Sequence, residues 1–230
     1  RWDVYMSKST DKYFDQQQPA YRIREREMPT PVKLSPLAKQ VCYILTGGDT
    51  AYCNFRFGTQ LVSQAKFLDV AWYISAGAIQ VVEMPSGTGT AAEYYPCTAH
   101  PDKKATLQVK SPLNEAHHIT VSNVIHEATH AMQDIQRLIL AQEDAEAAAF
   151  VAQAVYFHYR RFPEAPLTGD SPSDAIMKVA FDIASANVGG FIVDAADEAR
   201  LRKVILEHPH YRSNTDPFFK YRFPGVAIPP

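Results

Sequence analysis

The sequence predicts an α+β fold that is mainly helical, with a small sheet whose edge strand lies beside a helix carrying two histidines. Most apolar residues recur at the three- and four-residue spacing of helices, whereas residues 105–111 alternate apolar and polar side chains as a half-buried strand does. The chain has 230 residues, of which 46% are hydrophobic, so it can bury a substantial core. We expect residues 32–230 to form one domain behind a polar N-terminal arm, residues 1–31.

The first part of this domain is predicted to contain two helices and a strand. Residues 36–45 form an apolar-periodic run that the Gly47-Gly48 pair stops, and a second helix is expected over 59–74. The short apolar run 78–84 predicts a strand. The glycine-rich residues 85–90 match no phosphate-binding pattern, so we interpret them as a loop.

The strand predicted over 105–111 ends at Pro112, shortly before the two histidines. We expect this strand to lie beside the histidine-bearing helix. The free backbone groups of a sheet edge can pair with an extended peptide. An ordinary strand without a role in binding fits the same pattern equally well.

The segment from His126 to His130 reads His-Glu-Ala-Thr-His, the HExxH pattern of zinc peptidases. Residues i and i+4 lie on one face of a helix about one turn apart, so both imidazoles can reach one tetrahedral metal ion. Glu127 lies about 100° further round the helix, where it can take a proton from the attacking water as a general base. The pattern therefore predicts Zn²⁺ at the two histidines and a catalytic Glu127.

A helix is predicted over residues 121–137, with Ser122 or Asn123 as its N-cap. Its apolar stripe consists of Ile125, Ala128, Met132, Ile135 and Ile139. His126 and His130 lie off that stripe, so the helix can bury one side and present both histidines to a cleft. A surface helix with two solvated histidines is the alternative.

The third metal ligand is expected from a second helix, which the alanine-rich segment 141–156 predicts. If the two helices pack antiparallel across a turn near residues 138–140, Glu146 returns to the metal. Glu143 lies one turn earlier on the same face and is the second choice, whereas Asp144 points elsewhere. A solvated helix face would also explain these three acids.

No glycine or proline interrupts residues 134–142, so one long helix is the alternative to two. In that case the third ligand would come from His158, His208 or His210. The last two, together with Tyr211, are also candidates for stabilising the oxyanion that forms when an amide is hydrolysed. Polar surface residues near a helix end explain them better from sequence alone.

The C-terminal part is predicted to add two helices. Behind a proline-rich linker, residues 162–172, they span 173–186, with Ser173 as the N-cap, and 195–206. The aromatic tail over 218–223 is too apolar to be simply solvated, so we expect it to pack onto the body of the protein.

Residues 119–155 resemble the zinc-binding region of the thermolysin-like gluzincin metallopeptidases. In that family one helix bears HExxH and the next bears a Glu-Ala pair whose glutamate is the third ligand, which the resemblance places at Glu146. Asp134 also matches an aspartate of the family. The spacing from His130 to Glu146 is shorter than in that family, and Phe150 stands where an aspartate orients a ligand histidine. The short spacing is more similar to compact bacterial zincin domains.

The resemblance implies a zincin-like fold, in which an edge strand, here expected at 105–111, runs beside the cleft and pairs with an extended peptide. It also implies a zinc metallopeptidase that acts on a protein or peptide substrate. The metzincin class is disfavoured, because Gln133 and Gln136 stand where that class has a glycine and a third ligand. Two other functions stay open. One is a non-enzymatic binding or structural module in which zinc holds two helices together, and the other is a zinc amidohydrolase acting on a non-peptide amide.

Composition argues against nucleic-acid and membrane-surface binding, because 23 Lys and Arg are balanced by 25 Asp and Glu. No apolar run reaches the roughly 18 residues that span a bilayer. The sequence begins at Arg1 without a methionine, so we expect a processed or trimmed chain and leave its compartment open. Cys42, Cys53 and Cys97 lack paired metal-ligand spacing and are expected to be buried thiols.

Overall fold

The structure is a computed structural model, and its helices and small sheets make it mixed α/β and mostly helical, as expected. It describes residues 32–85, 91–97, 104–111, 113, 118–166, 169, 171–187, 189–212 and 220–226. These ranges contain seven α-helices, one 3-10 helix and eight strands in three sheets. The predicted arm and the greater part of the predicted glycine-rich loop lie outside the described residues.

The first predicted helix is confirmed as α1 (Pro36–Thr46). The hydroxyl of its N-cap, Ser35, accepts a hydrogen bond from the backbone N–H of Ala38 at 3.1 Å. The helix stops at its C-cap, Gly47, and a 3-10 helix, η2 (Gly48–Thr50), follows. The Ser35 hydroxyl thus explains where this element begins.

The second predicted helix, 59–74, is wrong in its first third. The structure has a hairpin there, in which β1 (Asn54–Phe57) pairs antiparallel with β2 (Gln60–Ser63) before α2 (Gln64–Ser75) begins. Gly58 in the turn adopts φ 54°, which glycine tolerates without strain. Because β2 runs directly into α2 and both carry apolar residues, their sequences read as one helix.

A second sheet has the strand order β3-β5-β4, comprising β3 (Ile79–Glu83), β5 (Ala105–Val109) and β4 (Ala92–Tyr95). The strands predicted over 78–84 and 105–111 are therefore confirmed. The prediction that 105–111 is an edge strand is wrong, since β5 pairs with β3 on one side and β4 on the other. The edge strand that contacts the histidine-bearing helix is β4, which the sequence did not predict.

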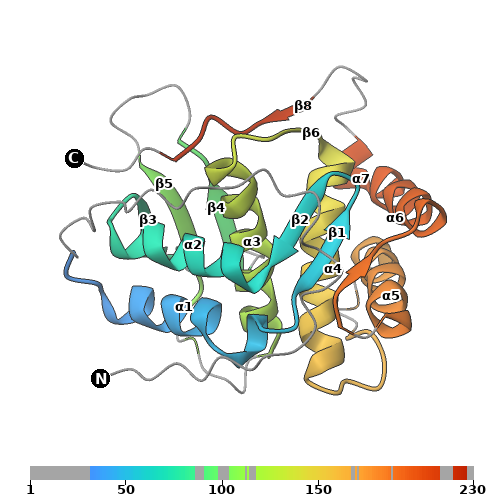
Figure 1. Ribbon diagram of the computed structural model, residues 1–230, viewed down its shortest axis with the longest axis horizontal. Coiled ribbons are helices and arrows are strands. Elements are labelled where there is room, and N and C mark those ends of the chain that lie inside the picture. The colour runs from blue at the N-terminus through green and yellow to red at the C-terminus, as the bar shows by residue number, and fades with distance from the viewer. Residues whose placement is uncertain are drawn as a thin grey trace.

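The histidine-bearing helix is α3 (His118–Ile135), which begins earlier than expected. Ser122 and Asn123 lie inside it, so neither is the predicted N-cap. The Ser122 hydroxyl instead donates to the Ile119 carbonyl within the helix. In Figure 1, α3 lies between the β3-β5-β4 sheet and α4 (Gln142–Tyr159), and it contacts both.

The chain reverses between α3 and α4 at a left-handed residue that is not glycine. Arg137 has φ 54°, its N–H donates to the Asp134 carbonyl, and the N–H of Leu138 donates to the Gln133 carbonyl. These two bonds form a Schellman motif, which ends a helix. A short strand, β6 (Ile139–Ala141), leads into α4, so the alternative of one long helix is wrong.

Two C-terminal helices, α5 (Ser171–Ala186) and α6 (Ala195–Glu207), contact the side of α4 away from α3 (Figure 1). Both were predicted, but Ser173 lies inside α5 and is not its N-cap. Between them β7 (Phe191–Ile192) joins the hairpin sheet, giving the strand order β2-β1-β7.

The chain then returns to α3 and α4. The four-residue helix α7 (Pro209–Arg212) follows α6, and β8 (Lys220–Arg222) pairs antiparallel with β6. Phe223 is buried against Leu140 and Ala145. The described end of the aromatic tail therefore packs onto the body of the protein, as expected.

Candidate metal centre

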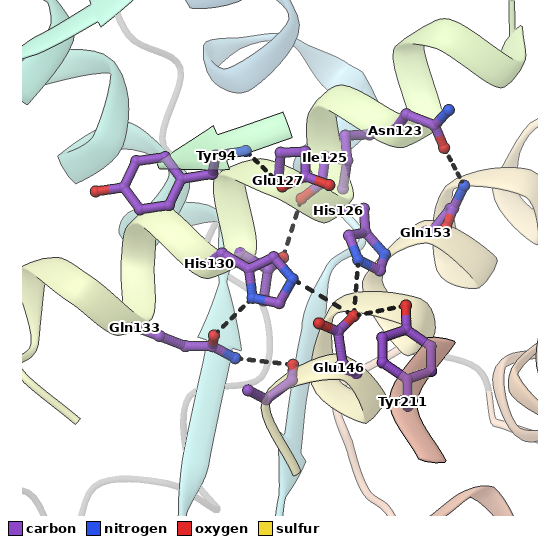
Figure 2. Close-up of polar contacts among 12 residues, drawn as sticks. Tyr94, Asn123, Ile125, His126, Glu127, His130, Gln133, Glu146, Gln153 and Tyr211 are labelled. Atoms are coloured by element: carbon purple, nitrogen blue, oxygen red, sulfur yellow. Dashed lines mark hydrogen bonds and ion pairs between the residues drawn. The ribbon is translucent and has the colours of Figure 1, made fainter. Parts of the chain in front are cut away.

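The structure brings His126, His130 and Glu146 together. One ligand atom from each lies within 4.8 Å of the other two, with both histidines on α3 and the glutamate on α4. Glu146 Oε2 is 3.4 Å from His126 Nε2 and 3.6 Å from His130 Nε2. Dashed lines mark both contacts in Figure 2. His126 and Glu146 are buried and His130 is half-buried.

The other predicted candidates have different surroundings. Glu143 is half-buried in the first turn of α4, and Asp144 forms an ion pair with Arg202 at 2.5 Å. The His158 ring packs against Phe181. The side chain of His208 contacts the Ser173 hydroxyl at 3.1 Å, and the His210 ring lies beside those of His208 and Tyr211. Among the described residues, none of these side chains belongs to the three-residue group.

Small side chains allow Glu146 to approach the histidines. Ala145, Ala147, Ala148 and Ala149 are all fully buried around it. The distance between packed helices depends on the side chains at their contact, so alanines let α4 lie close to α3. The alanine-rich composition that predicted a helix also explains why the two helices meet closely enough to share a site.

The electrostatics of the group call for a cation. Burial would raise the pKa of Glu146, but the two histidines outweigh it and hold that pKa well below its usual range. Burial would lower the pKa of His130, yet Glu146 raises it to about 9. A buried carboxylate facing two imidazole nitrogens thus needs a positive charge, which a proton or a metal ion can supply. Two histidines and a carboxylate form a donor set that suits zinc.

Glu127 lies next to this group and is held by the edge strand. Its Oε2 accepts a hydrogen bond from the backbone N–H of Tyr94 in β4 at 2.8 Å (Figure 2). Burial raises the pKa of Glu127, and the neighbouring histidines only partly offset this. A raised carboxyl pKa favours uptake of a proton, as a general base requires.

Asp134 lies outside the three-residue group, and its carboxylate holds other parts of the fold together. It is fully buried, and its two oxygens accept hydrogen bonds from the Tyr94 hydroxyl at 2.6 Å and from the Gly225 N–H at 2.7 Å. Burial and the Asp134 carboxylate both raise the pKa of Tyr94, so the phenol stays protonated and donates. Asp134 therefore joins β4 and the C-terminal segment to α3.

Two neighbours of the histidines were not predicted as site residues. Gln133 Oε1 lies 2.9 Å from His130 Nδ1. The Phe150 ring packs edge-on against His126, with centroids 4.7 Å apart, at the position where gluzincins have an orienting aspartate. Their spacing could have identified them in the sequence. Gln133 is three residues after His130 and Phe150 is four after Glu146, and residues three or four apart are neighbours on a helix.

Of the three residues predicted as candidates for stabilising the oxyanion, Tyr211 is the one that contacts the group of His126, His130 and Glu146. Its hydroxyl donates to Glu146 Oε2 at 3.3 Å from the short helix α7 (Figure 2). From sequence, nothing distinguished it from His208 and His210. The fold separates them, because only Tyr211 of the three has a described contact with one of the three ligand candidates.

Comparisons with models of protein families, with curated proteins and with solved structures found no match for this chain. The likeness to gluzincins therefore stays a prediction from a short stretch of residues. In the part of the chain that the structure describes, no helix is both long and apolar enough to cross a membrane. Of the three cysteines, Cys53 is buried, as expected, whereas Cys42 and Cys97 are only half-buried.

Proposed function

We propose that this protein is a zinc-dependent metallopeptidase in which His126, His130 and Glu146 hold the metal. The observation that carries the proposal is the convergence of these three ligand atoms, within 4.8 Å, from two packed helices. A catalytic zinc site typically has three protein ligands and one open position, whereas a structural site is closed by a fourth. The three-residue group found among the described residues favours catalysis over a structural zinc.

Zinc, when bound, polarises the substrate carbonyl and lowers the pKa of water to about 7. Glu127 is the general base. It takes a proton from the water whose oxygen attacks the carbonyl carbon, and it delivers that proton to the amine nitrogen as the carbon–nitrogen bond breaks. Its hydrogen bond from Tyr94 holds the carboxylate on the β4 side of the group during both transfers.

The position of β4 favours a peptide over a small amide as substrate. Among the described strands β4 pairs only with β5, and its Tyr94 N–H points away from β5 to Glu127. An extended peptide lying along this edge would pass directly beside the general base. A small amide would gain nothing from such an edge.

The Glu127→Gln variant tests the proposal. Glutamine has nearly the same shape and cannot take the proton, so we expect the variant to retain zinc and lose cleavage of a peptide library. Metal content is measured by mass spectrometry, and the parent is digested with and without a chelator. Unchanged cleavage by Glu127→Gln, or iron in place of zinc in the parent, would contradict the assignment.

The two rival functions give different results in the same measurements. A zinc-containing parent that cleaves no peptide and no simple amide would indicate a structural or binding module. Chelator-sensitive hydrolysis of small amides without peptide cleavage would indicate an amidohydrolase.

A further inference from the structure

We propose that Gln133 and Gln60 are positioning residues of the metal centre. Together they form a buried pair of side-chain amides that fixes the orientation and tautomer of His130 and holds the turn of α4 that carries Glu146. The proposal rests on the proposed metal site and names two residues outside its ligands. One of them, Gln60, belongs to the β1-β2 hairpin, which contributes no ligand.

The hydrogen bonds of the two amides form a continuous chain. Gln133 Oε1 lies 2.9 Å from His130 Nδ1, and Gln133 Nε2 donates to Gln60 Oε1 at 2.8 Å and to the Ala145 carbonyl at 3.0 Å. Gln60 Nε2 donates in turn to the Asp144 carbonyl at 2.8 Å. Gln133 is 2% exposed and Gln60 is 5% exposed, so water does not compete for these bonds.

The chain of hydrogen bonds has only one consistent direction. The carbonyls of Asp144 and Ala145 can only accept, so each glutamine must turn its NH₂ group toward them. Gln133 then presents its oxygen to His130, and an amide oxygen can only accept. His130 Nδ1 therefore carries the hydrogen, which leaves Nε2, the nitrogen facing Glu146, as the metal ligand.

The same bonds connect the two ligand-bearing helices beside the site. Ala145 directly precedes Glu146, and Gln133 is one turn after His130. Gln133 thus joins α3 to the first turn of α4, and Gln60 joins that turn to β2. We therefore expect the amide pair to set the separation of His130 from Glu146 before any metal binds.

Gln153 provides a matched control. It is also a buried glutamine, 7% exposed, and it links the same helices from α4 by donating to Ser122 and Asn123 on α3. Neither acceptor is a proposed ligand. Replacing Gln153 should therefore destabilise the helix pair without disturbing His130.

The experiment replaces each glutamine by methionine, which has similar length and no amide. Zinc affinity is measured by competition with a chelating dye, and the stability of the metal-free protein by thermal unfolding. Gln133→Met should weaken zinc binding about 10- to 100-fold, as loss of a ligand's hydrogen-bond partner typically does. Gln153→Met should lower thermal stability comparably while leaving zinc affinity within about twofold of the parent.

Gln60→Met tests the chain from its far end and keeps Gln133 in place. It should weaken zinc binding in the same direction but less, because Gln133 retains its bond to Ala145. The double variant should lose less zinc affinity than the two single losses added together, since part of the effect of Gln60 passes through Gln133. The absorption spectrum of the cobalt-substituted protein should shift in Gln133→Met and stay unchanged in Gln153→Met.

Four results would overturn the proposal in whole or in part. Equal zinc affinities for Gln133→Met and Gln153→Met would reduce Gln133 to a packing role, and additive losses in the double variant would show that Gln60 does not act through Gln133. If the parent binds and uses zinc while Gln133→Met matches it, only the amide pair is refuted. A parent that binds no zinc would refute the metal site and the proposed function as well.

Discussion

Glu146 brings a buried negative charge to within 3.4 Å and 3.6 Å of two imidazole nitrogens. Such a charge is stable only with a positive partner, so the residue favours either protonated histidines or a bound cation. Glu143, one turn earlier, is half-buried and free of this constraint. The difference between the two acids lies in their surroundings, since their chemistry is identical.

Metal content should therefore respond to one of these acids and not to the other. Glu146→Ala removes the carboxylate that faces the histidines, and we expect it to lose most bound zinc. Glu143→Ala is the matched control and should retain zinc at the level of the parent. Mass spectrometry of the purified variants measures this, and loss of zinc in Glu143→Ala alone would reverse the assignment.

Tyr211 is the predicted oxyanion-stabilising candidate whose hydroxyl contacts Glu146. Tyr211→Phe should keep zinc bound and lower kcat for peptide cleavage by about 10²- to 10³-fold, with a smaller change in KM, if its hydroxyl stabilises the oxyanion. Tyr159→Phe, which alters an exposed tyrosine stacked on Tyr52, is the control. Equal kcat in the parent and Tyr211→Phe would exclude this role.

At the scale of elements, the site depends on how α3, α4 and β4 are joined. Asp134 connects α3 to Tyr94 of β4 and to Gly225, while the Schellman motif at Arg137 turns the chain toward α4. Gly225 and Arg137 also lie close together, because a Cβ atom at Gly225 would meet the Arg137 side chain. These contacts surround the end of α3 and fix the direction in which α4 leaves it.

Removing the Asp134 carboxylate should loosen this junction. Asp134→Ala leaves the Tyr94 hydroxyl and the Gly225 N–H without their acceptor, and we expect a loss of about 3 kcal/mol in the free energy of unfolding. Tyr94→Phe removes only one of the two bonds and should cost about 1 to 2 kcal/mol. Urea denaturation measures both, and a smaller loss in Asp134→Ala than in Tyr94→Phe would contradict this account.

At the scale of the whole molecule, one hydrophobic core joins the N-terminal and C-terminal halves around the site. Cys53, directly before β1, lies in this core, and its sulfur contacts the Ala152 carbonyl of α4. Burial raises the pKa of this thiol to about 12, and Asp49 adds to the effect. The folded protein therefore holds the thiol proton more tightly than the unfolded chain does.

The stability of the whole protein should consequently fall at alkaline pH. A thiol pKa raised by folding contributes stability that is complete below the unfolded value, about 8.5, and is lost as pH rises toward the folded value. Between pH 8.5 and 10.5 the parent should lose about 2 to 3 kcal/mol relative to Cys53→Ala, at about 1.4 kcal/mol per pH unit. Urea denaturation across this range gives the comparison, and parallel pH profiles would rule the effect out.

The sequence by itself determined the features that depend on neighbours along the chain. The four-residue spacing of His126 and His130 places both imidazoles on one helical face, and apolar periodicity predicted most helices of the described chain. These signals are local, because a helical turn is closed by residues four apart. Where a strand runs directly into a helix, as at residues 60–75, the same patterns did not show where the strand ends and the helix begins.

Only the tertiary structure decided which distant residues meet. It separated Glu146 from Glu143, made β4 the edge strand beside Glu127, and brought Tyr211 to the site. It also joined Gln133 to Gln60, which are 73 residues apart in the chain. Such contacts arise from the packing of helices and strands against a shared core, and no short-range pattern of residues encodes them.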